Sequence, residues 1–301
     1  MLHMQGNSES RFGRPRILIV GCGDVGRRLL PELTKTHQVI VLTSQASKLS
    51  EFRALRAVPV LGNLDQRHTL TRLSTLASTV IHLAPPNPEG LRDLRTQNLL
   101  RILSQGGRVR RFVYVSTTGV YGHCAGDWVS ESDPVNPRTS RAKRRVDAEN
   151  QIRAWAVASQ VTASILRVPG IYAGNRLPID RLRQGTPALL PEEDVFTNHI
   201  HADDLAGLIL MAIYRGRPQR LINTSDDSYL KMGDYFDLVA RYTKLPKAPR
   251  VSFEELREAV SPMMLSFMQE SRRVRNQRMS ELGYELQYPS VEDFLKAHYA
   301  S

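Results

Sequence analysis

The chain has 301 residues, 41% of them hydrophobic, which is enough for one large α/β domain with a sizeable core. No apolar run approaches the roughly 20 residues of a membrane span, and the polar start lacks the apolar segment of a secretory signal. The formal net charge is +11, but the basic residues are scattered and do not alternate with aromatic residues. We therefore expect neither a membrane nor a nucleic-acid partner.

The chain contains only two cysteines, Cys22 and Cys124, which excludes a disulfide framework. No set of His, Asp, Glu and Cys residues has the spacing of a metal site, so we expect no metal. Such cysteine usage fits a reducing compartment, and we expect a cytoplasmic protein. The polar segment 1–13 predicts a flexible tail ahead of the domain.

The first predicted strand, 17–20, leads directly into a glycine-rich turn. Gly21, Gly23 and Gly26 follow with the spacing G-x-G-x-x-G, and a helical pattern begins behind them. In dinucleotide-binding turns the first glycine permits the bend, the second lets the backbone approach a pyrophosphate, and the third lets the helix pack on the sheet. The position between strand and helix favours a dinucleotide site over a glycine-rich turn without a ligand.

The residues after the second predicted strand, 38–42, indicate which cofactor this turn would hold. An acidic residue there binds the adenosine ribose 2′-OH of NAD. This chain has Thr43 and Ser44 instead, with Lys48 and Arg53 close by. Small hydroxyls and cations suit a 2′-phosphate, so the sequence favours NADP, with NAD as the alternative.

Strand and helix patterns alternate along the rest of the chain. Further apolar strands are predicted over 58–61, 79–83, 111–116, 161–166 and 221–223. Helices are predicted over 89–105, 140–158 and 252–275, and Pro31 predicts a kink or a shortened segment in the first helix. This alternation predicts an α/β fold, a doubly wound parallel sheet of the Rossmann type with helices on both faces.

Five ordered segments resemble the extended short-chain dehydrogenase/reductase superfamily, which includes nucleotide-sugar epimerases and dehydratases. They are G-N-L-D (62–65), I-H-L-A (81–84), F-V-Y-V-S-T-T-G-V-Y-G (112–122), L-R-V-P-G-I-Y (166–172) and H-I-H-A-D-D-L-A (199–206). The glycine turn is closer to the general dinucleotide motif, so the chain resembles an atypical branch, the YeeZ-type proteins. The resemblance implies one NAD(P)-binding domain over 14–301, with a substrate lobe from about 171–194 and 226–296.

The resemblance also implies which residues hold the cofactor. The segment 62–65 matches the one that holds the adenine, and 81–84 matches the strand that lines the cofactor. With the glycine turn and the end of the second strand, the expected cofactor contacts are Gly21, Gly23, Asp24, Val25, Gly26, Thr43, Ser44, Asn63, Leu64, Leu83, Ala84, Pro85 and Lys143.

In this superfamily a Ser or Thr, a Tyr, and a Lys four residues after the Tyr carry out the chemistry. The resemblance assigns the first role to Thr117 and the last to Lys143, but Thr139 stands at the Tyr position. An aliphatic hydroxyl has no accessible alkoxide near neutral pH, so the usual proton relay is missing. Among Tyr121, His123 and Lys143, Tyr121 is the favoured substitute, although its plainer interpretation is a pocket-lining aromatic residue.

The expected substrate is a small polar molecule, because the nucleotide-sugar signature is incomplete. Enzymes of that kind often carry an Arg before the I-H pair, where this chain has T-N-H (197–199). Arg176, Arg181 and Arg183 are the remaining cationic candidates, and we expect them to be solvated.

Two functions stay open at this point. Thr117 and Lys143 favour an NADP-dependent oxidoreductase or epimerase-like enzyme, whereas the missing Tyr favours a non-catalytic NADP(H)-binding sensor or interaction protein. The helices 89–105 and 140–158 match the pair through which extended members commonly dimerise, so the resemblance allows a homodimer.

Overall fold

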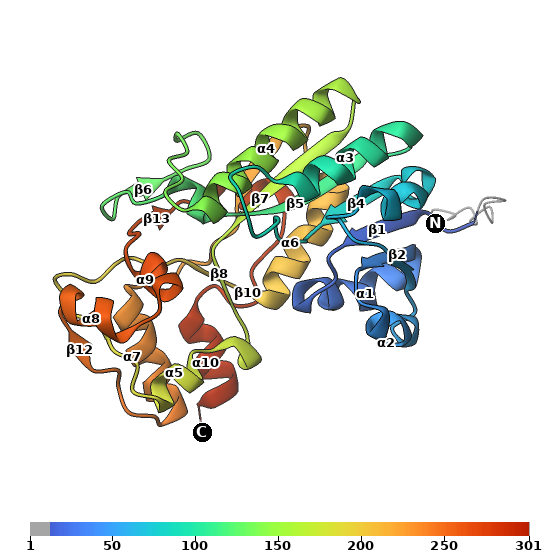
Figure 1. Ribbon diagram of the computed structural model, residues 1–301. Coiled ribbons are helices and arrows are strands. Elements are labelled where there is room, and N and C mark those ends of the chain that lie inside the picture. The colour runs from blue at the N-terminus through green and yellow to red at the C-terminus, as the bar shows by residue number, and fades with distance from the viewer. Residues whose placement is uncertain (1–12, 301) are drawn as a thin grey trace, which may run out of the picture.

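The computed structural model describes residues 13–300, apart from the side chains of Pro262, Met263 and Phe267. Seven parallel strands form its central sheet in the order β11-β7-β5-β4-β1-β2-β3 (Figure 1). The predicted doubly wound sheet is thereby confirmed, and its strand order reverses between β1 and β4. The strands are β1 (Arg16–Val20), β2 (Gln38–Thr43), β3 (Val58–Leu61), β4 (Thr79–His82), β5 (Arg111–Thr117), β7 (Thr162–Val168) and β11 (Arg220–Asn223).

Both faces of the sheet are buried, because successive side chains of a strand point in opposite directions. In β1, Ile17 and Ile19 belong to one apolar cluster, while Leu18 and Val20 belong to the other. Helices α1 and α6 cover the first face, and α3 and α4 cover the second (Figure 1). The helices of this domain are α1 (Asp24–Thr36), α2 (Leu49–Ala54), α3 (Leu94–Gly106), α4 (Ser140–Ala158) and α6 (Ala202–Arg215).

Helix α1 runs unbroken through Pro31, so the helix is not shortened there. Proline lacks the N–H that would bind the carbonyl of residue 27, but its fixed φ is compatible with a helix. Leu29, Leu30 and Leu33 surround it and are buried against the sheet. Packing of this apolar stripe therefore outweighs the missing hydrogen bond.

Two other helix predictions need correction. The pattern over 89–105 becomes helical only after Asp93, whose side chain accepts a backbone N–H of the first turn at 3.0 Å and caps α3. The pattern over 252–275 is not one helix, because Ser261 caps a second helix that begins with proline. That segment folds as α8 (Phe253–Ala259), α9 (Pro262–Met268) and β13 (Arg273–Val274).

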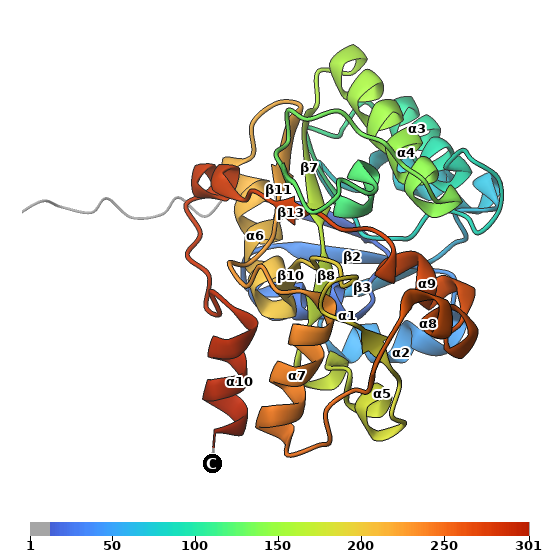
Figure 2. The same ribbon diagram turned by 90° about the vertical axis from the view of Figure 1, so that its left-hand side faces the viewer.

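A smaller lobe has its own apolar cluster, which includes Tyr172, Phe236, Leu256 and Phe294. Figures 1 and 2 both show α7 beside α10 within this lobe. Within residues 13–300, no helix has the length and apolar character needed to cross a membrane. The remaining elements are β6 (Trp128–Val129), β8 (Gly170–Tyr172), α5 (Ile179–Arg183), β9 (Ala188–Leu189), β10 (His199–His201), α7 (Met232–Thr243), β12 (Arg250–Val251) and α10 (Val291–Tyr299).

Candidate cofactor and substrate site

The glycine turn after β1 is packed too closely to accept side chains at two of its glycines. Gly21 has φ of +86°, and a Cβ there would lie 2.6 Å from the backbone nitrogen of Ala84. A Cβ on Gly26 would lie 3.0 Å from Cys22 Sγ and 3.3 Å from Leu83 Cδ1. The turn is therefore held between the ends of β1 and β4, where the strand order reverses.

The middle glycine is different, because open space lies in front of it. A Cβ on Gly23 would have no atom within 4 Å. No side chain caps the start of α1 behind it, so the N–H groups of the first turn of α1 remain available to donate to a ligand. A dinucleotide pyrophosphate suits this arrangement, since its oxygens accept such N–H groups and gain from the helix dipole. Val25, in the first turn of α1, is half-buried beside this space.

An acidic residue, Asp24, opens α1 next to the pyrophosphate position. Its carboxylate lies 3.3 Å from Arg28 Nε and 3.3 Å from Arg176 Nη1. Arg28 also binds Asp203 at 2.6 Å. Arg176 comes from the lobe, in the turn Gly174–Arg176, so this ion cluster joins the lobe to the cofactor turn.

The end of β2 presents hydroxyls, as the sequence predicts. Thr43 is half-buried and its hydroxyl accepts the Gln45 N–H at 3.2 Å, while Ser44 is exposed. Cations also lie close to the glycine turn. Burial raises the pKa of the Cys22 thiol to about 12, and the charges of Arg27 and Lys48 oppose that shift.

The structure also brings an acid near this turn that sequence reasoning missed. Glu51, on α2, binds Arg27 Nε at 2.6 Å, and this pairing lowers the pKa of Glu51. The carboxylate is thus compensated by a cation. A contact between two helices, at residues 27 and 51, leaves no local pattern in the sequence.

The segment expected to hold an adenine is fixed by an ion pair. Asn63 Oδ1 accepts the Asp65 N–H at 3.0 Å, and Leu64 is buried. Arg95 binds both carboxylate oxygens of Asp65 and donates to the carbonyl of Pro85 at 3.3 Å. The segments that follow β3 and β4 are therefore tied to each other through α3.

A cavity of about 620 Å³ separates the carboxyl end of β5 from the lobe. Thr117 lines it, and its hydroxyl accepts the Gly119 N–H at 3.2 Å. Thr139 lines it too, but its hydroxyl accepts the Ala142 N–H at 3.2 Å and caps α4. The residue at the expected Tyr position is therefore used as a helix cap.

The structure does not bring Lys143 to this cavity. Lys143 is exposed, whereas Arg141 lines the cavity and Arg145 donates to the Tyr114 hydroxyl at 2.8 Å. Residues four apart share a helix face, and residues two apart lie about 200° apart around the axis. Arg145 and Glu149, four residues apart, therefore share the face of α4 that contacts β5 and β7, whereas Lys143 is exposed.

Tyr121 lies in the core, not on the cavity wall. Its hydroxyl donates to Asn223 Oδ1 at 2.8 Å, and the Arg167 guanidinium lies 4.8 Å from its ring centroid. Burial raises the pKa of Tyr121. The neighbouring His123 accepts the Ser271 N–H on Nδ1 at 3.1 Å. Neither side chain is directed at the cavity beside Thr117.

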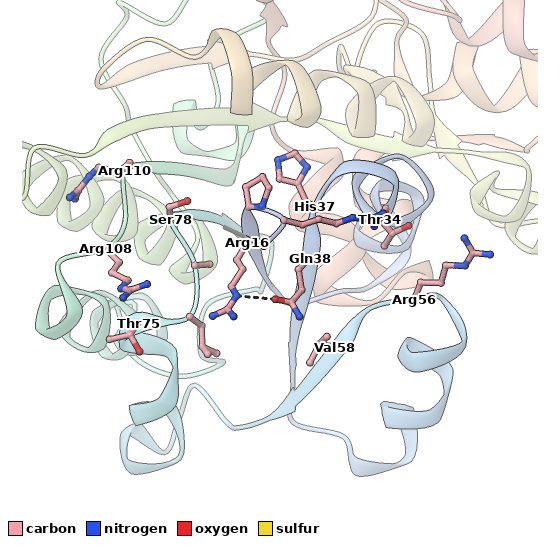
Figure 3. A pocket seen from close by; sticks show the side chains of 15 residues that line it. Arg16, Thr34, His37, Gln38, Arg56, Val58, Thr75, Ser78, Arg108 and Arg110 are labelled. Atoms are coloured by element: carbon pink, nitrogen blue, oxygen red, sulfur yellow. Dashed lines mark hydrogen bonds between the residues drawn. The ribbon is translucent and has the colours of Figure 1, made fainter. Parts of the chain in front are cut away.

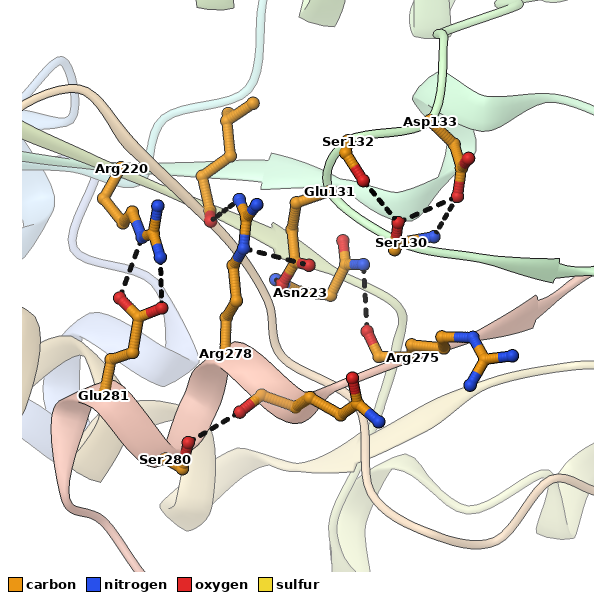
Figure 4. A network of polar contacts seen from close by, with 12 residues as sticks. Ser130, Glu131, Ser132, Asp133, Arg220, Asn223, Arg275, Arg278, Ser280 and Glu281 are labelled. Atoms are coloured by element: carbon orange, nitrogen blue, oxygen red, sulfur yellow. Dashed lines mark hydrogen bonds and ion pairs between the residues drawn. The ribbon is translucent and has the colours of Figure 1, made fainter.

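Asn223, at the end of β11, anchors the loop that follows β5 (Figure 4). Its N–H donates to Glu131 Oε1 at 2.8 Å, and its side-chain amide donates to the Arg275 carbonyl at 3.0 Å. Glu131 also lies 3.6 Å from Arg278 Nε. The loop between β5 and α4 is therefore fixed at the carboxyl edge by residues distant in sequence.

A buried ion pair joins α4 to the sheet beneath the cavity. Arg167 Nη2 on β7 lies 2.8 Å from Glu149 Oε2, and both side chains are about 5% exposed or less. Ser116 donates its hydroxyl to the same carboxylate. The pair fixes the position of the helix whose inward face reaches the cavity.

The lobe side of the cavity contributes phenols and cations. Tyr172 and Tyr235 line it, with the His199 ring 4.3 Å from that of Tyr235. Arg176 and Arg181 also line it, and both are exposed, as the sequence predicted. Arg183 does not line it, and pairs with Asp180 at 3.6 Å on the surface.

Three buried polar side chains lie next to this wall: His199, whose Nδ1 has no hydrogen-bond partner among the described residues, and Tyr172 and Asp226, which interact with each other. Burial raises the pKa of Asp226 to about 7 and lowers that of His199 to about 3. Sequence reasoning did not select these residues. The available signal was that Tyr172 and His199 fall in two segments, 166–172 and 199–206, that resemble the extended superfamily; Asp226 lies outside both.

Comparisons with known proteins agree with this geometry. A family model described as NAD(P)H-binding matches residues 21–214. A functionally unknown conserved protein from Silicibacter pomeroyi is 28% identical, with a TM-score of 0.80, covering 95% of this chain and 98% of that one. UDP-glucose 4-epimerase from Thermotoga maritima has the same fold, at 19% identity and a TM-score of 0.76 over 95% of this chain and 97% of that one.

One curated relative also matches over part of its length. The human dTDP-D-glucose 4,6-dehydratase is 25% identical over 124 residues, which are 38% of this chain. The match spans 35% of that dehydratase.

Proposed function

The chain belongs to the NAD(P)H-binding family, and from this premise we propose that it is an NADP(H)-dependent reductase or epimerase-like enzyme of a small polar substrate. The bound cofactor supplies or accepts a hydride. The observation that carries the proposal is the cavity beside Thr117, at the carboxyl edge of the sheet. In doubly wound folds, substrates bind at that edge near the reversal of strand order.

The preference for NADP rests on charge near the end of β2. Thr43 and Ser44 supply hydroxyls. The charge of Lys48 reaches this region, where it helps Arg27 to lower the pKa of Glu51. Glu51 is the nearby acid, and Arg27 compensates it at 2.6 Å. A 2′-phosphate gains from this balance, whereas a ribose 2′-OH finds no free carboxylate there.

Two hydroxyls on the cavity wall can stabilise charge on a substrate oxygen. Thr117 Oγ1 already accepts an N–H, so its own O–H is free to donate. Burial raises the pKa of the Tyr172 phenol, so it stays protonated and can donate, with the Asp226 carboxyl as its neighbour. Donors preorganised in this way stabilise a developing oxyanion.

A spectrophotometric screen tests the proposal. Purified protein is mixed with NADPH and a panel of small carbonyl compounds, and loss of the reduced nicotinamide absorbance is followed. Thr117→Ala should lower the rate about 100-fold with the cofactor affinity kept. Arg153→Ala, at an exposed position of α4 that has no expected role in the site, is the matched control and should keep the rate. If the protein binds NADPH but no compound in the panel causes its oxidation, the proposed enzymatic function is wrong.

A second candidate is a non-catalytic NADP(H)-binding sensor. It is favoured by the use of Thr139 as a helix cap, because the usual relay then lacks its phenol. The sensor requires a protein partner whose affinity changes with cofactor occupancy. Equal partner affinity with and without saturating NADPH would reject it.

A further inference from the structure

A second cleft lies at the amino edge of the sheet, opposite the edge described above. Its volume is about 960 Å³. None of the described residues that line it is acidic, while hydroxyls of Thr34, Thr75 and Ser78 contribute to its wall. Five arginines line it: Arg14, Arg16, Arg56, Arg108 and Arg110. The cleft therefore concentrates positive charge that the sequence shows only as scattered residues.

The fold assembles this cluster because parallel strands all begin at the same edge. Arg16 opens β1, and Arg110 directly precedes β5. Arg56 lies in the turn before β3, and Arg108 lies in the loop after α3. Figure 3 shows Arg16 and Arg108 directed toward the middle of the cleft, with Arg56 and Arg110 at its two ends.

Two of the guanidiniums are held by helix ends. Arg14 donates to the Thr34 carbonyl at 3.2 Å, in the last turn of α1, and Arg110 donates to the Gly107 carbonyl at 2.9 Å, after α3. Cations are favoured at such positions by the helix dipole. A guanidinium has five N–H donors, so both keep donors for a ligand. Arg16 is oriented by Gln38, whose side-chain oxygen accepts its Nε–H at 2.9 Å.

No carboxylate in residues 13–300 pairs with any of the five. Other arginines of this chain do form ion pairs, such as Arg95 with Asp65 and Arg241 with Glu292. The five like charges therefore repel one another without a counter-charge from the described protein. An anion in the cleft relieves that repulsion.

We propose that this cleft binds a small, phosphate-dense anion, either inorganic polyphosphate or a nucleoside polyphosphate. Arginine matches phosphate oxygens with paired N–H donors, and the cleft size suits such a molecule. His37 is the only ring among the described lining residues that could stack on a base, so phosphates are the recognised groups.

Isothermal titration calorimetry at low salt tests the site with two probes, inorganic tripolyphosphate and ATP. NADPH is kept saturating in the ATP titrations, so that the glycine turn does not contribute. The double variant R16E/R108E should weaken tripolyphosphate binding at least about tenfold. R153E/R257E is the matched control: it makes the same charge change at exposed arginines outside the cleft and should change affinity less than about twofold. Binding of ATP much tighter than tripolyphosphate assigns the nucleoside form, and equal binding assigns the inorganic form.

Three outcomes would overturn the proposal. They are no tripolyphosphate binding to the wild-type protein, an equal loss in the two double variants, and tighter binding of a short single-stranded DNA that R16E/R108E abolishes. Unchanged melting temperature and NADPH affinity in R16E/R108E verify that the variant is folded. The result is independent of the proposed enzyme, because neither probe reports on hydride transfer.

Discussion

Arg176 Nη1 lies 3.3 Å from Asp24 Oδ2, and this contact joins the lobe to the first turn of α1. A carboxylate beside the open space at Gly23 opposes a bound pyrophosphate, so the guanidiniums of Arg28 and Arg176 are needed to balance it. Because Arg176 also lines the cavity beside Thr117, it connects the glycine turn to that cavity. We expect it to turn toward the pyrophosphate when a dinucleotide binds.

Arg176→Ala should therefore weaken NADPH binding about fivefold, through the loss of one charge-assisted contact. Calorimetric titration with NADPH measures this. Arg183→Ala is the matched control, because Arg183 comes from the same part of the lobe and pairs with Asp180 but does not itself line the cavity. Equal NADPH affinity in wild type and Arg176→Ala would contradict the role given to Arg176.

Lys48→Ala should separate the two cofactors. We expect a loss of about tenfold for NADPH and less than about twofold for NADH, because only the 2′-phosphate meets the ammonium group. Both dissociation constants are measured on the same preparation. The matched control is Lys35→Ala. Lys35 lies in the last turn of α1, far from the glycine turn, and pairs with Glu32, so its loss should change neither dissociation constant. A parallel loss for both cofactors would refute the preference for NADP.

Glu149→Gln should lower the free energy of unfolding by about 3 kcal/mol, because it leaves Arg167 charged and buried without its partner. Denaturant titration measures the loss. Glu292→Gln, which breaks the more exposed pair with Arg241, should cost less than about 1 kcal/mol. Similar losses in the two variants would show that burial does not set the strength of the Glu149 pair.

Asp226 should make stability depend on pH. Burial raises its pKa in the folded protein to about 7, well above that of an unfolded aspartate, and the neighbouring Asp227 acts in the same direction while Ser228 and Tyr172 oppose it. Between these two pKa values the folded state binds more protons, so the contribution of Asp226 to stability falls as pH rises from about 4 to about 7.

Asp226→Asn should remove this dependence, since an amide does not titrate and its oxygen can still accept the Ser228 N–H. The free energy of unfolding of the variant, relative to that of the wild type, should therefore be higher at pH 8 than at pH 5. Denaturant midpoints at the two pH values measure the difference. A constant difference between the two proteins at both pH values would contradict the raised pKa.

The sequence predicted the parts of the site that depend on local spacing. G-x-G-x-x-G between a strand and a helix fixes the turn at Gly21 because only glycine accepts its φ and its contact with Ala84. The bounds of α4 were also predictable, since Thr139 is a suitable cap for a helical pattern. Alternating strand and helix patterns were sufficient for the doubly wound sheet, because parallel strands require crossover helices.

Only the tertiary structure decided which side chains meet. Lys143 and Arg145 are two residues apart, and packing of α4 on β5 and β7 determined that Arg145 faces inward. The Tyr121 hydroxyl donates to Asn223, which is 102 positions away in the sequence, and this contact holds Tyr121 in the core. The five arginines of the amino-edge cleft also come from separate segments, and only the packing of those segments brings them together. Spacing sets the conformation of a segment, but contacts between distant segments depend on how the whole chain packs, and no local pattern encodes them.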